Sequence, residues 1–95
     1  MITHVVLCRF KAGITPDSDA ATSLDAMLKA LPTQISDILE WRCGFNTTPD
    51  PAASDYLLYA TFADRDALNR YFEHPAHLAV VTQALKIADL SFADI

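Results

Sequence analysis

The stretch that most constrains the fold is ITHVVLCRF, residues 2–10, which is rich in β-forming residues and apolar on both of its faces. One face carries Ile2, His4, Val6, Cys8 and Phe10, and the other carries Thr3, Val5, Leu7 and Arg9. Successive side chains of a strand point to opposite faces of its sheet, so this alternation separates two sets. Because both sets are largely apolar, the strand needs a packing layer on each side.

The segments that follow alternate between helical and extended patterns. Thr15 followed by Pro16 predicts the start of a helix, because threonine is a good N-cap and proline is tolerated in the first turn. Apolar residues then recur at helical spacing up to Pro32, where we expect the helix to end. The segments ILEWRCGFN at 38–46 and DYLLYATF at 55–62 predict two strands, joined as a hairpin by a loop that contains prolines.

A second helical region is divided by a proline. Asp64 is suited to cap a helix over residues 65–72, and Pro75 predicts a new helix that continues through residues 76–88. A last short strand is expected near residues 90–95. The predicted order of elements is therefore β-α-β-β-α-β.

This order predicts an α+β, ferredoxin-like fold, in which an antiparallel sheet of spatial order 4-1-3-2 carries both helices on one face. The other face stays open, although the third strand adds Leu57 and Tyr59 to it, opposite Leu58 and Phe62. An uncovered apolar face of this size is a liability in a monomer. We therefore expect a homodimer in which the two copies pack sheet to sheet.

Composition limits the class of protein. The chain has 95 residues, 52% of them hydrophobic and only two of them glycine, which predicts one compact domain over residues 1–95. A formal net charge of −5 argues against nucleic acid or an anionic membrane as a partner, because both attract clustered lysine and arginine. No stretch has the features of a signal peptide or a membrane span, so we expect a cytoplasmic location.

The cysteines and histidines give no sign of a metal or a cofactor. Cys8 and Cys43 form no C-x-x-C motif and fall on strands that are not predicted neighbours, so we expect two reduced, buried thiols. His74 and His77 are three positions apart rather than the four of a zinc-binding helix, and no carboxylate is tied to them by sequence. We therefore expect neither a metal site nor a cofactor.

The residues that could carry chemistry gather in YFEHPAHL, residues 71–78. Pro75 disfavours the α conformation at His74, so His74 is expected to cap the new helix, with His77 in its first turn. The positive end of the helix dipole disfavours imidazolium there, and a neutral imidazole is what a general base needs. Tyr71, one turn before the break, is placed to donate a hydrogen bond to a developing enolate.

His4 joins this group if its strand face lies under the helices, where its ring is expected to polarise a carbonyl group. A base, a donor and a second imidazole in an apolar cleft would form an enolisation site. The candidate catalytic residues are therefore His77, Tyr71 and His4, and the candidate ligand pocket adds Val6, Cys8, His74 and Phe72.

Each of these residues also has a structural interpretation. His77 can serve only to bond backbone groups at the helix break, and His74 can serve only as a cap. A single histidine on an apolar strand face, such as His4, is more often a hydrogen-bonded core residue than a reactive one. Tyr71 lies at helical spacing from other apolar residues and by default belongs to the core.

Four segments of the chain also resemble a known family: HVVLCRFK at 4–11, LPTQISDILEWRCGFN at 31–46, YATFADRDALNRYFEHPAH at 59–77 and the terminal FADI. Together they are similar to the stress-responsive dimeric α/β-barrel (Dabb) family over nearly the whole chain. The resemblance implies a ferredoxin-like protomer and a dimer whose two sheets close into a barrel. Most members have no assigned reaction, but a plant branch of the olivetolic acid cyclase type is a cofactor-free polyketide cyclase. The functional groups of that branch match His4, Tyr71 and His77.

Three functions follow as hypotheses. The first is a stress-responsive homodimer that binds a small apolar or aromatic ligand without turnover. The second is a cofactor-independent, polyketide-cyclase-like enzyme that uses His77 as a general base on a keto or phenolic substrate. The third is a purely structural dimer. The first two require a cavity of roughly 300 Å³ or more that touches His77, and the third does not.

Overall fold

The computed structural model describes residues Met1–Ile95. Its elements are β1 (Ile2–Phe10), α1 (Asp19–Gln34), β2 (Glu40–Phe45), β3 (Tyr56–Phe62), α2 (Arg65–Glu73), α3 (Pro75–Ile87) and β4 (Ala88–Asp94). The predicted β-α-β-β-α-β order is confirmed, with the second helical region divided into α2 and α3. β2 is shorter than predicted, and β4 begins two residues earlier than expected, directly after α3.

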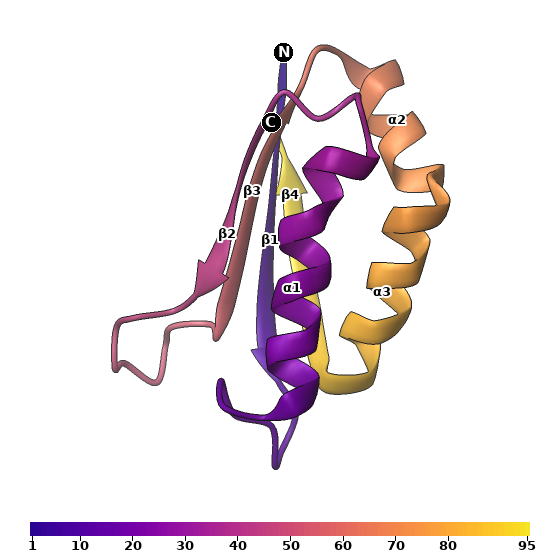
Figure 1. Ribbon diagram of the computed structural model, residues 1–95. Helices are drawn as coiled ribbons and strands as arrows, with labels where there is room; N and C mark the ends of the chain where they lie inside the picture. The colour runs from indigo at the N-terminus through magenta and orange to yellow at the C-terminus, as the bar shows by residue number, and fades with distance from the viewer.

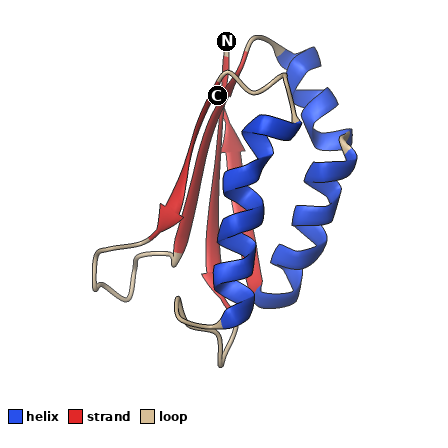
Figure 2. Cartoon of the chain, in the orientation of Figure 1, coloured by secondary structure: helices blue, strands red, loops and turns tan.

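The four strands form one antiparallel sheet in the order β2-β3-β1-β4. This is the predicted order, so the α+β, ferredoxin-like topology is confirmed. All three helices lie on one face of the sheet and leave the other face uncovered (Figures 1 and 2). No helix combines the length and the apolar character that crossing a bilayer requires.

The first helix differs from the prediction at both ends. Thr15 does not cap it, because Thr15 and Ser18 close a separate turn: the Ser18 N–H donates to the Thr15 carbonyl at 3.0 Å, and the Thr15 N–H donates to the Ser18 hydroxyl at 2.9 Å. Pro32 does not end it either, since α1 continues to Gln34. A proline removes only its own N–H from the ladder, and the Ile35 N–H still reaches the Leu31 carbonyl at 2.9 Å.

The caps of the second helical region are as predicted. The Asp64 carboxylate accepts a hydrogen bond from the Ala67 N–H at 2.8 Å. His74 has an extended backbone and accepts from the Ala76 N–H through Nδ1 at 3.0 Å, with Pro75 at the start of α3. The chain therefore changes direction at His74 because a proline and a side-chain cap act at the same point.

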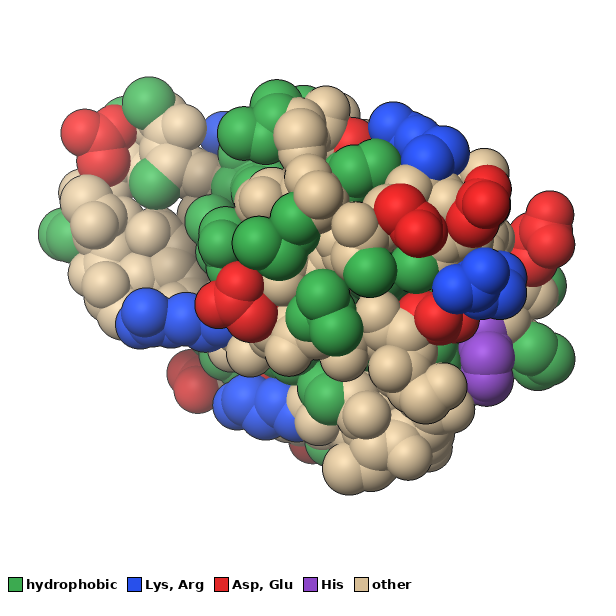
Figure 3. Space-filling model, turned by 90° about the horizontal axis from the view of Figure 1, so that it is seen from above, with side chains coloured by type: hydrophobic (Ala, Val, Ile, Leu, Met, Phe, Trp, Pro, Cys, Tyr) green, Lys and Arg blue, Asp and Glu red, His purple; other side chains and the backbone are tan.

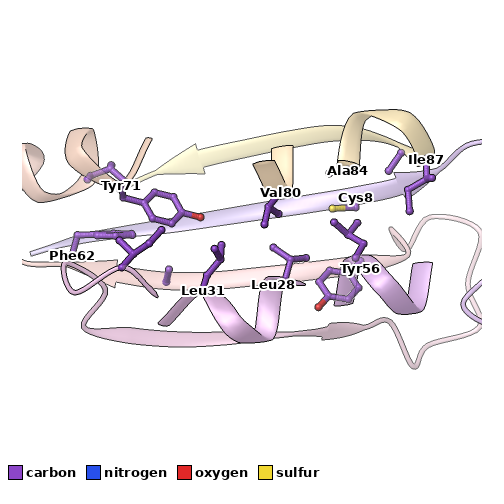
Figure 4. Close-up of a cluster of buried hydrophobic side chains, with 14 of the residues drawn as sticks. Cys8, Leu28, Leu31, Tyr56, Phe62, Tyr71, Val80, Ala84 and Ile87 are labelled. Atoms are coloured by element: carbon purple, nitrogen blue, oxygen red, sulfur yellow. The ribbon is translucent and has the colours of Figure 1, made fainter. Parts of the chain in front are cut away.

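The core lies between the helices and the inner face of the sheet (Figure 4). β3 supplies alternate residues to it, and Ala60 and Phe62 of this strand are completely buried. Leu68 of α2 is also completely buried, and α1 contributes Leu24, Leu28 and Leu31. The two cysteines lie on strands that β3 separates: the Cys8 thiol is buried, whereas that of Cys43 is only half-buried, and neither is bonded.

The outer face of the sheet carries two apolar rows at its centre. The strand register aligns Gly44, Leu57, Leu7 and Ser91 in one row, and Arg42, Tyr59, Val5 and Ala93 in the next. Leu7, Leu57 and Tyr59 are 38%, 42% and 37% exposed, respectively. The sequence-based expectation of an apolar, uncovered face on the protomer is therefore confirmed.

The Asp64 cap provides a test of the helix boundary. Asp64→Ala should lower the free energy of unfolding by about 1 kcal/mol, because it leaves a backbone N–H of the first turn without its partner. Urea titration monitored by circular dichroism measures this change. Asp66→Ala is the matched control, since it removes the same charge from the same turn without removing a cap bond. An equal loss in both variants would contradict the assignment of the cap.

Candidate functional site

A cavity of about 370 Å³ lies between the inner face of the sheet and the helices. Its lining residues are His4, Val6, Cys8, Leu28, Tyr56, Leu58, Tyr71, Phe72, His77, Val80, Val81, Ala84, Leu90 and Phe92. Most of these side chains are apolar, and the two histidines and Tyr71 lie together among them. The cavity has the size and character of a small-molecule site.

His4 is held in place by a carboxylate from the neighbouring strand. The β1–β4 register sets His4 directly opposite Asp94, and Nδ1 of His4 lies 2.5 Å from Oδ1 of Asp94. His4 is buried, with 3% of its surface exposed, while Arg65 approaches the other oxygen of Asp94 at 3.9 Å. Because a carboxylate only accepts, Nδ1 of His4 carries the shared proton. In the neutral ring, Nε2 is therefore an acceptor.

This tautomer changes the role expected for His4. The sequence-based hypothesis has His4 polarise a carbonyl, which requires a donor. In its neutral form, the ring that Asp94 orients instead offers a lone pair on Nε2. Aromatic side chains surround the ring, with centroid distances of 5.4 Å to Phe72, 5.8 Å to Phe92 and 5.9 Å to Tyr71.

The helix break leaves a main-chain carbonyl group available to accept a hydrogen bond from His77. In a continuous helix the Phe72 carbonyl would accept from the Ala76 N–H, but His74 takes that N–H as its cap. The Phe72 carbonyl is thus free, and Nδ1 of His77 lies 3.1 Å from it. A carbonyl only accepts, so Nδ1 is protonated, and Nε2 of the neutral ring is again an acceptor.

Burial is the main reason why the pKa of His77 is lowered from its ordinary value. The bond to the Phe72 carbonyl raises that pKa, whereas the nearby His4 and His74 lower it further. The sequence predicts a neutral His77 on the ground of the helix dipole; the pKa is lowered in the predicted direction, and its main cause is burial. A pKa below 6.5 leaves the His77 ring mostly neutral at pH 7.

Tyr71 brings a phenol hydroxyl to the same cavity. Its ring packs against that of His77 with centroids 4.3 Å apart, and only 1% of the residue is exposed. Burial, and then the charge of Cys43, raise the pKa of Tyr71, so the phenol keeps its proton. Figure 4 shows the hydroxyl pointing from α2 toward Val80, along the inner face of the sheet.

Cys8 forms part of the cavity floor without being reactive. Burial, reinforced by the charge of Asp55, raises the pKa of the Cys8 thiol to about 11. The thiol therefore stays protonated at pH 7, where a nucleophile would need to be a thiolate.

The structure brings most of the candidate residues together. His4, Tyr71 and His77 line one cavity, and so do Val6, Cys8 and Phe72. His74 does not line it, because its ring turns to the backbone of α3 as the cap. It is therefore a residue that shapes the site from outside.

Eight of the lining residues are not among the candidates from the sequence, and neither is Asp94, the partner of His4. Asp94 and Phe92 lie in the last strand, and they reach His4 because that strand pairs with β1 in a particular register. Alternation alone indicates that Phe92 and Asp94 share a face. The register that sets Asp94 opposite His4 depends on where α3 ends, which the sequence pattern does not fix.

Comparison with known proteins identifies the family. The model of the stress-responsive A/B barrel (Dabb) domain matches residues 2–94. An uncharacterised protein of Streptomyces coelicolor is 36% identical over 94 residues, which cover 99% of this chain and 97% of that protein. The chain therefore belongs to the stress-responsive A/B barrel domain family.

Solved structures share the fold at lower sequence identity. A dimeric ferredoxin-like protein of unknown function from Bacteroides fragilis is 24% identical, with a TM-score of 0.86 over 99% of this chain and 93% of that one. A hydroxynitrile lyase from Passiflora edulis is 17% identical, with a TM-score of 0.84 over 99% of this chain and 90% of that one. At these identities the likeness shows the ferredoxin-like fold.

The neutral state of His77 can be tested by titration. The His77 resonances in an NMR pH series should give a pKa below the ordinary value of 6.5, because burial penalises imidazolium. The folded chain then binds this proton less readily than the unfolded chain does. The corresponding stability is present above about pH 6.5 and is lost as the pH falls through the lowered pKa. A pKa above 6.5 would contradict the assignment of His77 as a neutral base.

Proposed function

We propose that the protein binds a small, mostly apolar molecule that carries a carbonyl group, and moves a proton to and from the carbon beside that group. The observation that carries this proposal is the meeting of two oriented imidazoles and a protonated phenol in one apolar cavity of about 370 Å³. Elsewhere the wall is largely aliphatic. Burial of apolar ligand surface against it would supply the binding, and the few polar groups would set the orientation.

In the proposed step Nε2 of His77 removes the proton. The carbon–hydrogen bond breaks, its electron pair forms the enolate, and negative charge develops on the carbonyl oxygen. The Tyr71 hydroxyl donates to that oxygen, and its raised pKa keeps it protonated for this purpose. Return of the proton from His77 to carbon, or to another atom of the ligand, completes the cycle.

His4 has a separate task in this scheme. Its Nε2 lone pair can accept a hydrogen bond from a hydroxyl or enol of the ligand, while Asp94 holds the ring from behind. A keto compound with a hydroxyl or enol as its second oxygen group, or a phenol, would therefore offer hydrogen-bonding partners to both the Tyr71 hydroxyl and Nε2 of His4. The hydroxynitrile lyase of the same fold is compatible with an enzyme here, as analogy at the level of fold.

Deuterium exchange tests the base without knowledge of the natural substrate. We expect the protein to accelerate exchange at the α-carbon of bound alkyl or aryl ketones and β-diketones in D₂O, followed by proton NMR. His77→Gln should reduce the accelerated rate about 100-fold or more, the usual contribution of a general base. His74→Asn is the matched control, because it removes an imidazole outside the cavity and asparagine can still cap α3.

The outcomes separate binding from catalysis. Ketones that shift the resonances of His4 and Tyr71 but exchange no faster than in buffer would leave a binding protein without turnover. Unchanged exchange in His77→Gln would remove His77 from the role of base. If no compound of the panel perturbs the cavity residues, the proposed ligand class fails as well.

We also propose that two copies pack through the outer faces of their sheets. The apolar rows at the centre of this face are flanked by polar residues on both sides, Glu40 and Thr3 at one end and Arg9 and Asp89 at the other. An apolar centre with a polar rim is typical of protein interfaces. The Bacteroides fragilis protein of this fold is dimeric, which supports a dimer here.

A charge on the outer face tests the dimer. Leu57→Asp should convert a dimer into a folded monomer, because it would bury a carboxylate without a partner between two sheets. Sedimentation velocity gives the mass of each species. Leu78→Asp is the control: Leu78 is 53% exposed but lies on α3, so this variant should remain dimeric. A dimeric Leu57→Asp variant would show that the copies meet elsewhere.

A further inference from the structure

One row of the outer face has large residues at its centre and small residues at its ends. Leu57 and Leu7 stand side by side in the middle, and the small residues Gly44 and Ser91 lie at the ends. Two packed sheets are about 10 Å apart, and their side chains interdigitate in that space. A second copy of the same row, offset along it, can therefore set one of its leucines over a small end of the first.

The surface is depressed at the end of this row where Gly44 lies. A depression of about 560 Å³ is lined by Arg42, Cys43, Gly44, Phe45, Thr47, Leu57 and Tyr59. The loop that follows β2 bends toward the side of the sheet that lacks helices, and from above it forms a lobe that stands off from the body (Figures 1 and 3). The depression thus lies on the outer face, beside a loop on the same side.

Nothing within the protomer requires a glycine at position 44. A Cβ atom built on Gly44 meets no atom within 4 Å, and the backbone there is not in the left-handed region that favours glycine. Glycine in the interior of a strand weakens it, because it loses more conformational freedom on folding and packs no side chain. The isolated protomer would therefore gain from a larger residue at this position.

We propose that the hollow at Gly44 receives a leucine side chain, Leu7 or Leu57, from a second copy of the chain. The two-fold symmetry of a homodimer forms the contact twice, because the Gly44 depression of each copy, here called the socket, receives a leucine from the other copy. The apolar centre of the row supplies the inserted group, and Gly44 supplies the space. This inference rests on the proposed sheet-to-sheet dimer, and it identifies the position that sets how closely the two copies approach.

Substitution of Gly44 tests the socket. Gly44→Leu should raise the dimer dissociation constant at least 10-fold, and Gly44→Ala should raise it by less, since each fills the space the partner needs. Sedimentation equilibrium measures the constant, and thermal unfolding of the monomer should show unchanged or higher stability. Thr22→Leu, which adds similar bulk on the exposed surface of α1, should leave the constant unchanged.

The other possible results would reject either the contact at Gly44 or the homodimer itself. If the wild-type dimer forms and neither Gly44 variant changes its dissociation constant, the hollow lies outside the interface and the socket is rejected. A tighter dimer in Gly44→Leu also rejects it, because the space would then be empty. A wild-type protein that is monomeric rejects the homodimer itself. If Gly44→Leu does not fold, Gly44→Ala decides alone.

Discussion

The pairing of β1 with both β3 and β4 is the constraint on which the rest of the structure depends. β1 lies inside the sheet, so its register with each neighbour decides which side chains meet on each face. On the inner face this register brings Asp94 to His4. On the outer face it aligns Leu7 with Leu57. A shift of one residue would reverse the two faces, and both the cavity and the apolar outer surface would be lost.

Most of the fold could be predicted from the sequence because its signals are local. The two-faced apolar pattern of residues 2–10 places the first strand inside a sheet, and Asp64 and Pro75 mark helix starts by capping chemistry that acts within one turn. The first helix was less well predicted. Thr15, Pro16 and Ser18 suit a turn as well as a cap, and in the structure Thr15 and Ser18 bond to each other in a turn before the helix.

The site could be predicted only in part. His4, Tyr71 and His77 have the residue types and positions that suggest acid–base chemistry, and they do line one cavity. The sequence did not reveal the tautomers of the two histidines. That of His4 is set by a residue distant in the chain, and that of His77 by a backbone carbonyl that the helix break leaves unpaired. Asp94 is 90 positions from His4, and the Phe72 carbonyl becomes available only because His74 caps the next helix. Such partners emerge from register and helix geometry rather than from residue type.

The carbonyl released at the helix break also bears on how this family can vary. His77 is oriented by the main chain of Phe72, so any residue at position 72 would present the same acceptor. The apolar walls of the cavity can therefore change in size and shape while the base keeps its tautomer. Pro75, which contributes no functional group to the cavity, helps to set this tautomer, because it starts α3 at the break that frees the Phe72 carbonyl. Under the proposed function, the residues that would select the ligand are thus distinct from those that orient His77.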